Sequence, residues 1–136
     1  MAKDRRARLT GKAGRSPFLG IPHHVIGSEA YKSLDGWAVK LLVDIAAQFK
    51  GNNNGDLCAA WSVMQDKGWN SKGTLHKALK ALLDAGLIEQ TRQGGRNRCS
   101  LYAITWRSID ECRGKLDVRP TNAPSSLYLK AVNEAA

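Results

Sequence analysis

Apolar residues recur at helical spacing in the stretch "LDGWAVKLLVDIAAQFK". Trp37, Leu41, Ile45 and Phe49 lie four residues apart, which places them on one face of a helix. Asp35 precedes this run and can cap the helix N-terminus through its side chain. The pattern predicts a helix that packs on a core through a continuous apolar stripe.

A further helix is predicted over residues 71–85, between a capping residue, Ser71, and a glycine, Gly86, suited to a left-handed C-terminal position. Its buried stripe is expected to consist of Leu75, Ala78, Leu79 and Leu82. "LIEQTRQ" and "CSLYAITW" then have the β-branched and aromatic residues of strands, and "GGRNR" joins them as a hairpin loop. Tyr102, Ile104 and Trp106 share one face of the second strand, which we expect to face the core.

Shorter elements are predicted between and before these. "AAWSVMQDKG" predicts a short helix that ends at Gly68, and Leu57 with Cys58 can form a very short strand. "GNNNGD" indicates a turn or a flexible loop, because Asn and Gly tolerate left-handed backbone.

The segment ahead of the first long helix is expected to be mostly extended. Pro17 and Pro22 disfavour helix here. Ser28 can cap a single helical turn that reaches Ser33.

The 136 residues suit one domain with different segments at its ends. Residues 1–16 are rich in Arg, Lys, Gly and Ala without an apolar period, which predicts a flexible basic arm. Residues 17–113 are expected to form the folded domain. Residues 114–136 contain Pro, Ser and Asn, and we expect a tail that is loose or docks on a partner.

The order helix, short strand, helix, turn, helix, hairpin predicts an α+β chain of the winged helix-turn-helix type, with a three-helix core and a two- or three-stranded β-wing. "SKGTLHKALKALLDAGLIEQTRQGG" followed by "LYAITW" resembles winged-helix proteins of phages and prophages. It is also similar to the N-terminal domains of phage and plasmid replication initiators and to small DNA-binding regulators. The resemblance covers residues 18–109 and implies that the helix over 71–85 lies in a DNA major groove.

Charge is concentrated in two parts of the chain. The composition is 43% hydrophobic and 24% charged, and the net charge is +9. Residues 1–15 carry six basic and one acidic residue, and residues 66–98 carry seven basic and three acidic. Such clustering favours a polyanionic partner, with nucleic acid ahead of an anionic membrane, and the winged-helix interpretation narrows the nucleic acid to double-stranded DNA. No apolar run approaches the roughly 20 residues that span a bilayer, so we expect a cytoplasmic, nucleoid-associated protein.

The helix is predicted to supply one set of DNA contacts. Its N-terminal N–H groups suit a phosphate, and its polar face would lie along the groove. The predicted contact residues are Ser71, Lys72, Gly73, Thr74, His76, Lys77 and Lys80. Capping alone is the alternative role for Ser71 and Thr74, and a solvated face is the alternative for the lysines.

The hairpin and the arm are predicted to add contacts with flanking phosphates. The hairpin residues are Arg92, Gln93, Arg96, Asn97 and Arg98. The arm residues are Arg5, Arg6, Arg8, Lys12 and Arg15, and their contribution is expected to be mostly independent of sequence and sensitive to salt.

The tryptophans divide into two groups by position. Trp37, Trp61 and Trp106 fall on apolar stripes and are expected in the core, which argues against single-strand binding by exposed aromatics. Trp69 stands beside the turn before residue 71 and is the one expected to be exposed or hinge-like.

Signals of enzyme or metal chemistry are weak. Three cysteines stand far apart without CxxC spacing, so we expect buried thiols rather than a disulfide framework or a zinc site. His23 and His24 lack further ligands at suitable spacing. There is no P-loop or nucleophile-elbow motif. We expect no enzyme activity, no cofactor, no metal and no small-molecule substrate.

The expected function is sequence-specific binding of duplex DNA in transcriptional regulation or replication control, in a phage or mobile element. The alternative is a protein-interaction module that docks on a host or phage complex. RNA binding by the arm alone is a third interpretation. A homodimer stays open, because the first long helix or residues 127–132 could pair.

Overall fold

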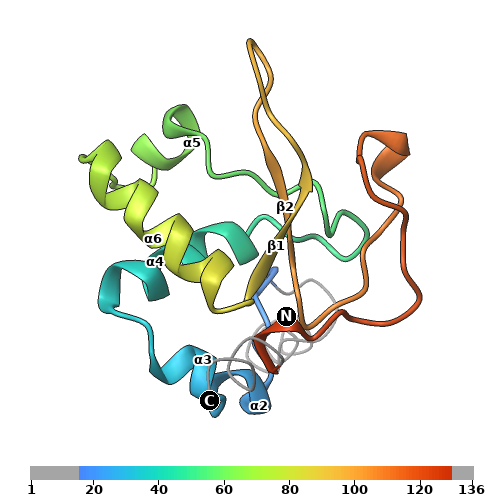
Figure 1. Cartoon of the computed structure of the whole chain (residues 1–136), viewed down its shortest axis with the longest axis horizontal. Helices are drawn as coiled ribbons and strands as arrows, with labels where there is room; N and C mark the ends of the chain where they lie inside the picture. Colours follow the sequence, from blue (N-terminus) through green and yellow to red (C-terminus); the bar gives the residue numbers. More distant parts are fainter. Residues whose placement is uncertain (1–15, 130–136) are drawn as a thin grey trace, which may run out of the picture.

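The computed structural model describes residues 16–129, which form helices and one two-stranded antiparallel sheet (Figure 1). In chain order the elements are α2 (His23–Ile26), α3 (Glu29–Lys32), α4 (Gly36–Ala46), α5 (Trp61–Gln65), α6 (Lys72–Asp84), β1 (Ile88–Arg92), β2 (Leu101–Ile104) and the 3-10 turn η1 (Cys112–Gly114). The expected α+β class is confirmed.

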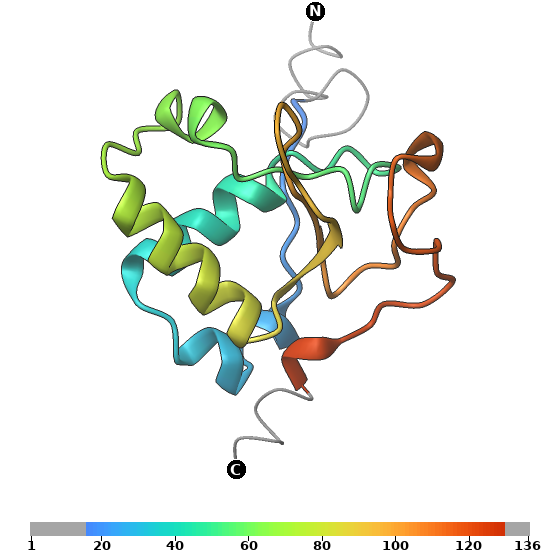
Figure 2. The ribbon, with the colours of Figure 1, turned by 45° about the horizontal axis from the view of Figure 1, so that its top comes forward.

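The core lies between α4, α6 and the inner face of the hairpin. Asp35 caps α4 as expected, since its Oδ1 accepts a hydrogen bond of 2.9 Å from the Ala38 N–H. Leu41, Leu42 and Ile45 are fully buried along α4. In Figures 1 and 2, α6 crosses in front of α4, so each helix covers the apolar stripe of the other.

The ends of α6 also match their predictions. Ser71 is the N-cap, and its Oγ accepts from the Thr74 N–H at 3.2 Å. Leu75, Ala78 and Leu82 are buried, whereas Leu79 is only partly covered. Gly86 follows with a φ of +74°, the left-handed conformation that ends the helix.

The hairpin pairs Ile88 with Ile104 and Gln90 with Tyr102, and a bulge leaves Thr91 without an opposite residue. The side-chain hydroxyl of Thr91 turns inward and donates to the Gly55 carbonyl at 2.6 Å. The expected short strand at Leu57 is a single bridge to Tyr102. This bridge still matters, because it joins the segment before α5 to the outer edge of β2.

The lead-in differs from its prediction at α2. Pro22 does not prevent a helix there: it is the residue directly before α2, with φ −61° and ψ 145°. Proline is compatible with a helix start, because the first N–H groups have no partner inside the helix. The expected turn after Ser28 is confirmed as α3, with Ser28 Oγ accepting from the Tyr31 N–H at 3.2 Å.

Residues 114–129 return along the hairpin and pack on the domain. The Asp117 N–H donates to the Thr91 carbonyl at 2.8 Å, and the Ser126 N–H donates to the Thr105 carbonyl at 2.9 Å. Tyr128 is 2% exposed and belongs to the core. This packing differs from the expected loose or partner-bound tail, because the segment bonds to the hairpin backbone and Tyr128 enters the core. Residues 1–15 and 130–136 lie outside the described residues, and so do the predicted arm contacts.

Asn54 is a fully buried side chain that joins the "GNNNGD" loop to the end of β2. Its Oδ1 accepts from the Ile104 N–H at 2.9 Å. Its Nδ2 lies 3.0 Å from the Ile104 carbonyl, 3.2 Å from the Arg107 carbonyl and 2.9 Å from the Ser108 carbonyl. Of the two predicted alternatives, a turn or a flexible loop, the structure shows the turn, and the Asn54 amide takes the place of a strand partner for the chain after β2.

Asn54→Ala is expected to lower the free energy of unfolding by about 2 kcal/mol. The substitution leaves the Ile104 N–H and the carbonyls of Ile104, Arg107 and Ser108 without the hydrogen bonds that the Asn54 side chain makes. Urea unfolding followed by circular dichroism measures the change. Asn52→Ala is the matched control, since Asn52 is exposed in the same loop and its loss should change stability by less than about 0.5 kcal/mol. Equal stabilities of the two variants would contradict the assigned role.

Candidate nucleic-acid interface

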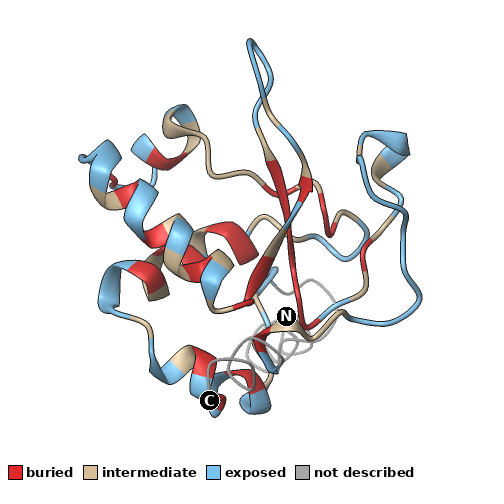
Figure 3. Ribbon diagram, in the orientation of Figure 1, coloured by how far each residue is buried: buried red, intermediate tan, exposed pale blue. Residues whose placement is uncertain are grey.

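The outward face of α6 is polar and open. Lys72, Gly73, His76, Lys77 and Lys80 are exposed, opposite the buried leucines. Figure 3 shows this exposed strip along the side of α6 that faces away from α4. Lys80 Nζ lies 3.4 Å from Asp84 Oδ2, but both side chains are largely exposed, so the pair is weak. The predicted helix residues therefore share one accessible surface.

The N-terminus of α6 uses its two hydroxyl side chains for capping. Ser71 Oγ accepts from the Thr74 N–H, and Thr74 Oγ1 lies 3.1 Å from the same oxygen. Gly73 has open space around it, since an added Cβ would meet only Ser71 Oγ at 3.9 Å. Lys72 Nζ lies 5.8 Å from the centre of the Trp61 ring, a cation–π contact that orients the ammonium group. A phosphate can thus approach the helix start through backbone N–H groups.

The hairpin residues divide into braces and exposed groups. Arg92 is a brace: its Nη2 donates to the Cys99 carbonyl across the hairpin at 2.9 Å. The Gln93 N–H donates to Asp117 Oδ2 at 2.9 Å. Arg96 and Asn97 form the exposed tip, where Asn97 adopts a φ of 59°. The side chains of the tip are therefore free to contact a ligand, whereas Arg92 and the backbone N–H of Gln93 already form hydrogen bonds within the domain.

Arg98 both helps to hold the hairpin together and is exposed at its tip. The Gly95 N–H donates to its carbonyl at 2.8 Å and closes the tip. Its Nη2 lies 3.7 Å from Asp117 Oδ1, and both side chains are about half exposed. Such an exposed pair stabilises little, so a phosphate can replace the carboxylate.

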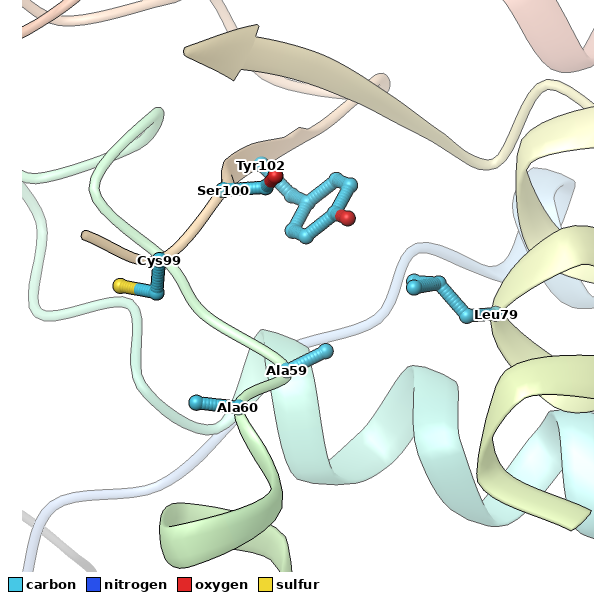
Figure 4. A pocket seen from close by; sticks show the side chains of 6 residues that line it. All are labelled: Ala59, Ala60, Leu79, Cys99, Ser100 and Tyr102. Atoms are coloured by element: carbon cyan, nitrogen blue, oxygen red, sulfur yellow. The ribbon is translucent and has the colours of Figure 1, made fainter. Parts of the chain in front are cut away.

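A crevice of about 270 Å³ separates α6 from the hairpin (Figure 4). Leu79 reaches from α6 toward the ring of Tyr102 on β2. The lining residues are Ala59, Ala60, Leu79, Cys99, Ser100 and Tyr102. Burial raises the pKa of the Tyr102 hydroxyl, so this wall is uncharged at neutral pH. The two charged surfaces therefore flank a small apolar gap.

The cysteines differ from the expected set of buried thiols. Cys99 is exposed between the hairpin tip and β2, whereas Cys58 and Cys112 are half-buried. Burial raises the pKa of both half-buried thiols, so they are protonated at neutral pH. The exposure of Cys99 follows from its position before the start of β2, beside the projecting tip.

The tryptophan predictions are reversed for two residues. Trp37 is 50% exposed in the first turn of α4, beyond the reach of α6. Trp69 is 2% exposed, and its Nε1 donates to Asp44 Oδ2 at 2.8 Å. The centres of the two rings lie 5.4 Å apart, so the Trp37 ring shields the Trp69 ring from solvent. The core position of Trp106 is confirmed, and Trp61 is half-buried.

Asp117 is a functional-site candidate that the sequence pattern did not indicate. It lies in the segment expected to be a tail, and nothing in its local sequence points to the hairpin. In the structure its carboxylate contacts Gln93 and Arg98, and its N–H contacts Thr91. It therefore sets the direction in which the hairpin projects.

No family model, curated protein or solved structure matches this chain. Within residues 16–129, every helix is too short or too polar to cross a membrane. The same residues contain no cluster of three or more His, Cys, Asp or Glu side chains that could hold a metal ion.

Asp117→Ala is expected to loosen the hairpin while the rest of the domain stays folded. Amide hydrogen exchange at residue 93 should rise at least about tenfold, because the N–H loses its acceptor. Exchange measured residue by residue by NMR tests this. Asp56→Ala is the control, since it removes a surface ion pair with Lys115 of 2.8 Å that does not touch the hairpin. An unchanged rate of amide hydrogen exchange at residue 93 would show that Asp117 does not hold the hairpin in place.

Proposed function

We propose that this chain is a winged helix-turn-helix protein that binds duplex DNA. One observation carries the proposal: the exposed basic face of α6 lies beside a projecting hairpin with an exposed basic tip. In Figures 1 and 2, α6 lies in front of α4, and the hairpin projects beside α6. Two adjacent basic protrusions suit the alternating groove and backbone of a duplex.

The packing of the helices supports the winged-helix part of the proposal. α4 and α6 bury their apolar stripes against each other, and α5 precedes α6 through a tight turn. Lys40 braces that turn, because its Nζ donates to the Lys67 carbonyl at 2.8 Å and to Asp44 Oδ2 at 2.7 Å. A turn held in this way keeps α6 at a constant angle to the domain, as a recognition helix requires.

α6 has a suitable size for the major groove. Its 13 residues make a helix about 20 Å long. A helix with side chains is about 10–12 Å wide, and the major groove of B-DNA is about 12 Å wide. In this position His76, Lys77 and Lys80 would reach base edges or the groove walls, and the N–H groups of the first turn would meet a phosphate.

The hairpin would contact the backbone through its tip. Arg96 and Asn97 carry most of this contact, and Arg98 joins when phosphate replaces Asp117. Arg92 and Gln93 are assigned a supporting role, because both hold the hairpin together. The arm contacts predicted at Arg5, Arg6, Arg8, Lys12 and Arg15 remain part of the proposal as a salt-sensitive addition.

The biological role is proposed from the sequence resemblance alone. Phage and prophage winged-helix proteins suggest transcriptional regulation or replication control. Selection of bound duplexes from a random pool would test this role. A palindromic winner would indicate a homodimer with two half-sites, and a single non-repeated site would indicate a monomer.

Lys77→Gln with Arg96→Gln is expected to weaken DNA binding by at least about tenfold at roughly 0.1 M salt. The slope of log K against log salt should fall by about two, because two phosphate-directed cations are lost. Fluorescence anisotropy with a labelled duplex over a salt series measures both. Neither side chain has a carboxylate partner among residues 16–129, so the fold should not change.

The matched control is Lys32→Gln with Arg107→Gln, which removes the same charge from exposed positions outside α6 and the hairpin tip, at the end of α3 and after β2. This variant should bind DNA within about twofold of the unaltered protein. If both double variants weakened binding equally, net charge rather than the proposed interface would account for it.

A protein-docking function is the second candidate, and the exposed ring of Trp37 favours it. The two candidates differ in their response to salt. DNA binding should fall linearly in log–log form, whereas an apolar contact centred on Trp37 should hardly respond. Trp37→Ala should leave DNA affinity within about twofold if the interface is α6 and the hairpin.

A further inference from the structure

The chain after β2 makes an unusual turn that displays a basic side chain. Cys112, Arg113 and Gly114 have φ values of 53°, 56° and 73°, so three consecutive residues adopt the left-handed conformation. Each non-glycine residue in this region costs about 1 kcal/mol. The turn is held by the Gly114 N–H, which donates to the Glu111 carbonyl at 3.2 Å, and by Cys112 Sγ, which lies 3.6 Å from the Asn54 carbonyl. Arg113 is thereby held outward and exposed.

Arg113 stands at the edge of a polar crevice of about 310 Å³. Its lining residues are Asn52, Asn53, Asp56, Cys112, Arg113 and Lys115. One wall is the loop after α4 and the other is η1. The two walls are tied together, because the Asn54 N–H donates to Asp110 Oδ2 at 2.8 Å and the Asp110 N–H donates to the Asn54 carbonyl at 2.9 Å.

Arg113 is the cation of this crevice that has no carboxylate partner among residues 16–129. The other two charged lining residues, Asp56 and Lys115, pair with each other at 2.8 Å, and Asp110 is turned inward to Asn54. Glu111 is exposed two residues before Arg113. Asn52 is exposed and lines the same crevice, so its amide adds a neutral donor. The crevice therefore offers a guanidinium and an amide to an anion.

We propose that this crevice binds a backbone phosphate of the duplex, on the side of the hairpin opposite to α6. The proposal rests on the proposed function and extends its footprint. Figures 1 and 2 both show the hairpin between α6 and the loop that carries η1. A duplex that lies across α6 and the hairpin tip therefore continues toward Arg113, and a guanidinium matches the geometry of phosphate oxygens.

The sequence did not indicate this site, because its charges cancel when they are counted along the chain. Residues 99–136 carry five basic and four acidic residues. In space, Asp110 and Asp117 are occupied by Asn54, Gln93 and Arg98, whereas Glu111, Arg113 and Arg119 are exposed. Arg113 thus adds an exposed cation on the η1 side of the hairpin.

Arg113→Asn tests the site and is expected to leave the fold unchanged. Asparagine is among the residues that adopt left-handed backbone most readily, so the turn keeps its conformation while the charge is removed. Anisotropy titrations should use duplexes that share one bound sequence and range from about one to about two helical turns, roughly 10 to 20 base pairs. For the shortest duplex, Arg113→Asn should have the same affinity as the unaltered protein.

On the longest duplex the variant should bind more weakly. The ratio of its affinities at 50 and 200 mM salt should be roughly threefold smaller than for the unaltered protein, as loss of one phosphate contact predicts. In hydroxyl-radical footprinting of the complex with Arg113→Asn, the DNA should lose its protection from cleavage at one edge of the bound segment only. Lys32→Gln, which removes one exposed charge at the far end of the domain, should leave affinity and footprint unchanged.

Equal affinities and identical footprints of Arg113→Asn and the unaltered protein on the longest duplex would overturn the proposal. Failure of the proposed function gives a different result. In that case Lys77→Gln with Arg96→Gln would bind the shortest duplex as tightly as the unaltered protein. Circular dichroism and thermal unfolding of Arg113→Asn exclude loss of structure as the cause of any change.

Discussion

The buried amide of Asn54 is the interaction on which the rest of the structure depends. It belongs to the loop after α4, and it contacts the backbone of Ile104, Arg107 and Ser108 at and beyond the end of β2. A two-stranded hairpin is marginal by itself and needs packing or a further partner. Asn54 and the Leu57 bridge supply that partner along β2, and the same loop forms one wall of the Arg113 crevice.

The hairpin is consequently held from both sides. α6 and the core cover its inner face, and residues 114–129 cover its outer face through Asp117 and Ser126. This double cover lets a thin basic tip project from a rigid base. The angle between the tip and α6 is then a property of the folded domain, so under the proposed function both would meet one duplex without an ordering cost on binding.

Local signals predicted the elements that depend on neighbouring residues. Ser71, the leucine stripe of α6 and Gly86 lie within sixteen residues of one another, and caps and helical periodicity act over that range. The polar face of α6 and the basic hairpin tip could therefore be named from the chain alone. Trp37 and Trp69 could not be distinguished, because the choice between them depends on where α6 crosses α4.

The sequence by itself determined α3, α4, α5 and α6, the hairpin and the concentration of positive charge, since propensity, periodicity and charge are properties of short stretches. Only the tertiary structure decided which charges are available. Asp117 comes to the hairpin from 24 residues beyond Gln93, and Asp110 is turned inward by Asn54, which lies 56 residues before it. Asp117 also pairs with Arg98, and neither carboxylate pairs with Arg96 or Arg113, which are exposed. Contacts between distant segments form only when the whole core is packed, so no local pattern encodes them.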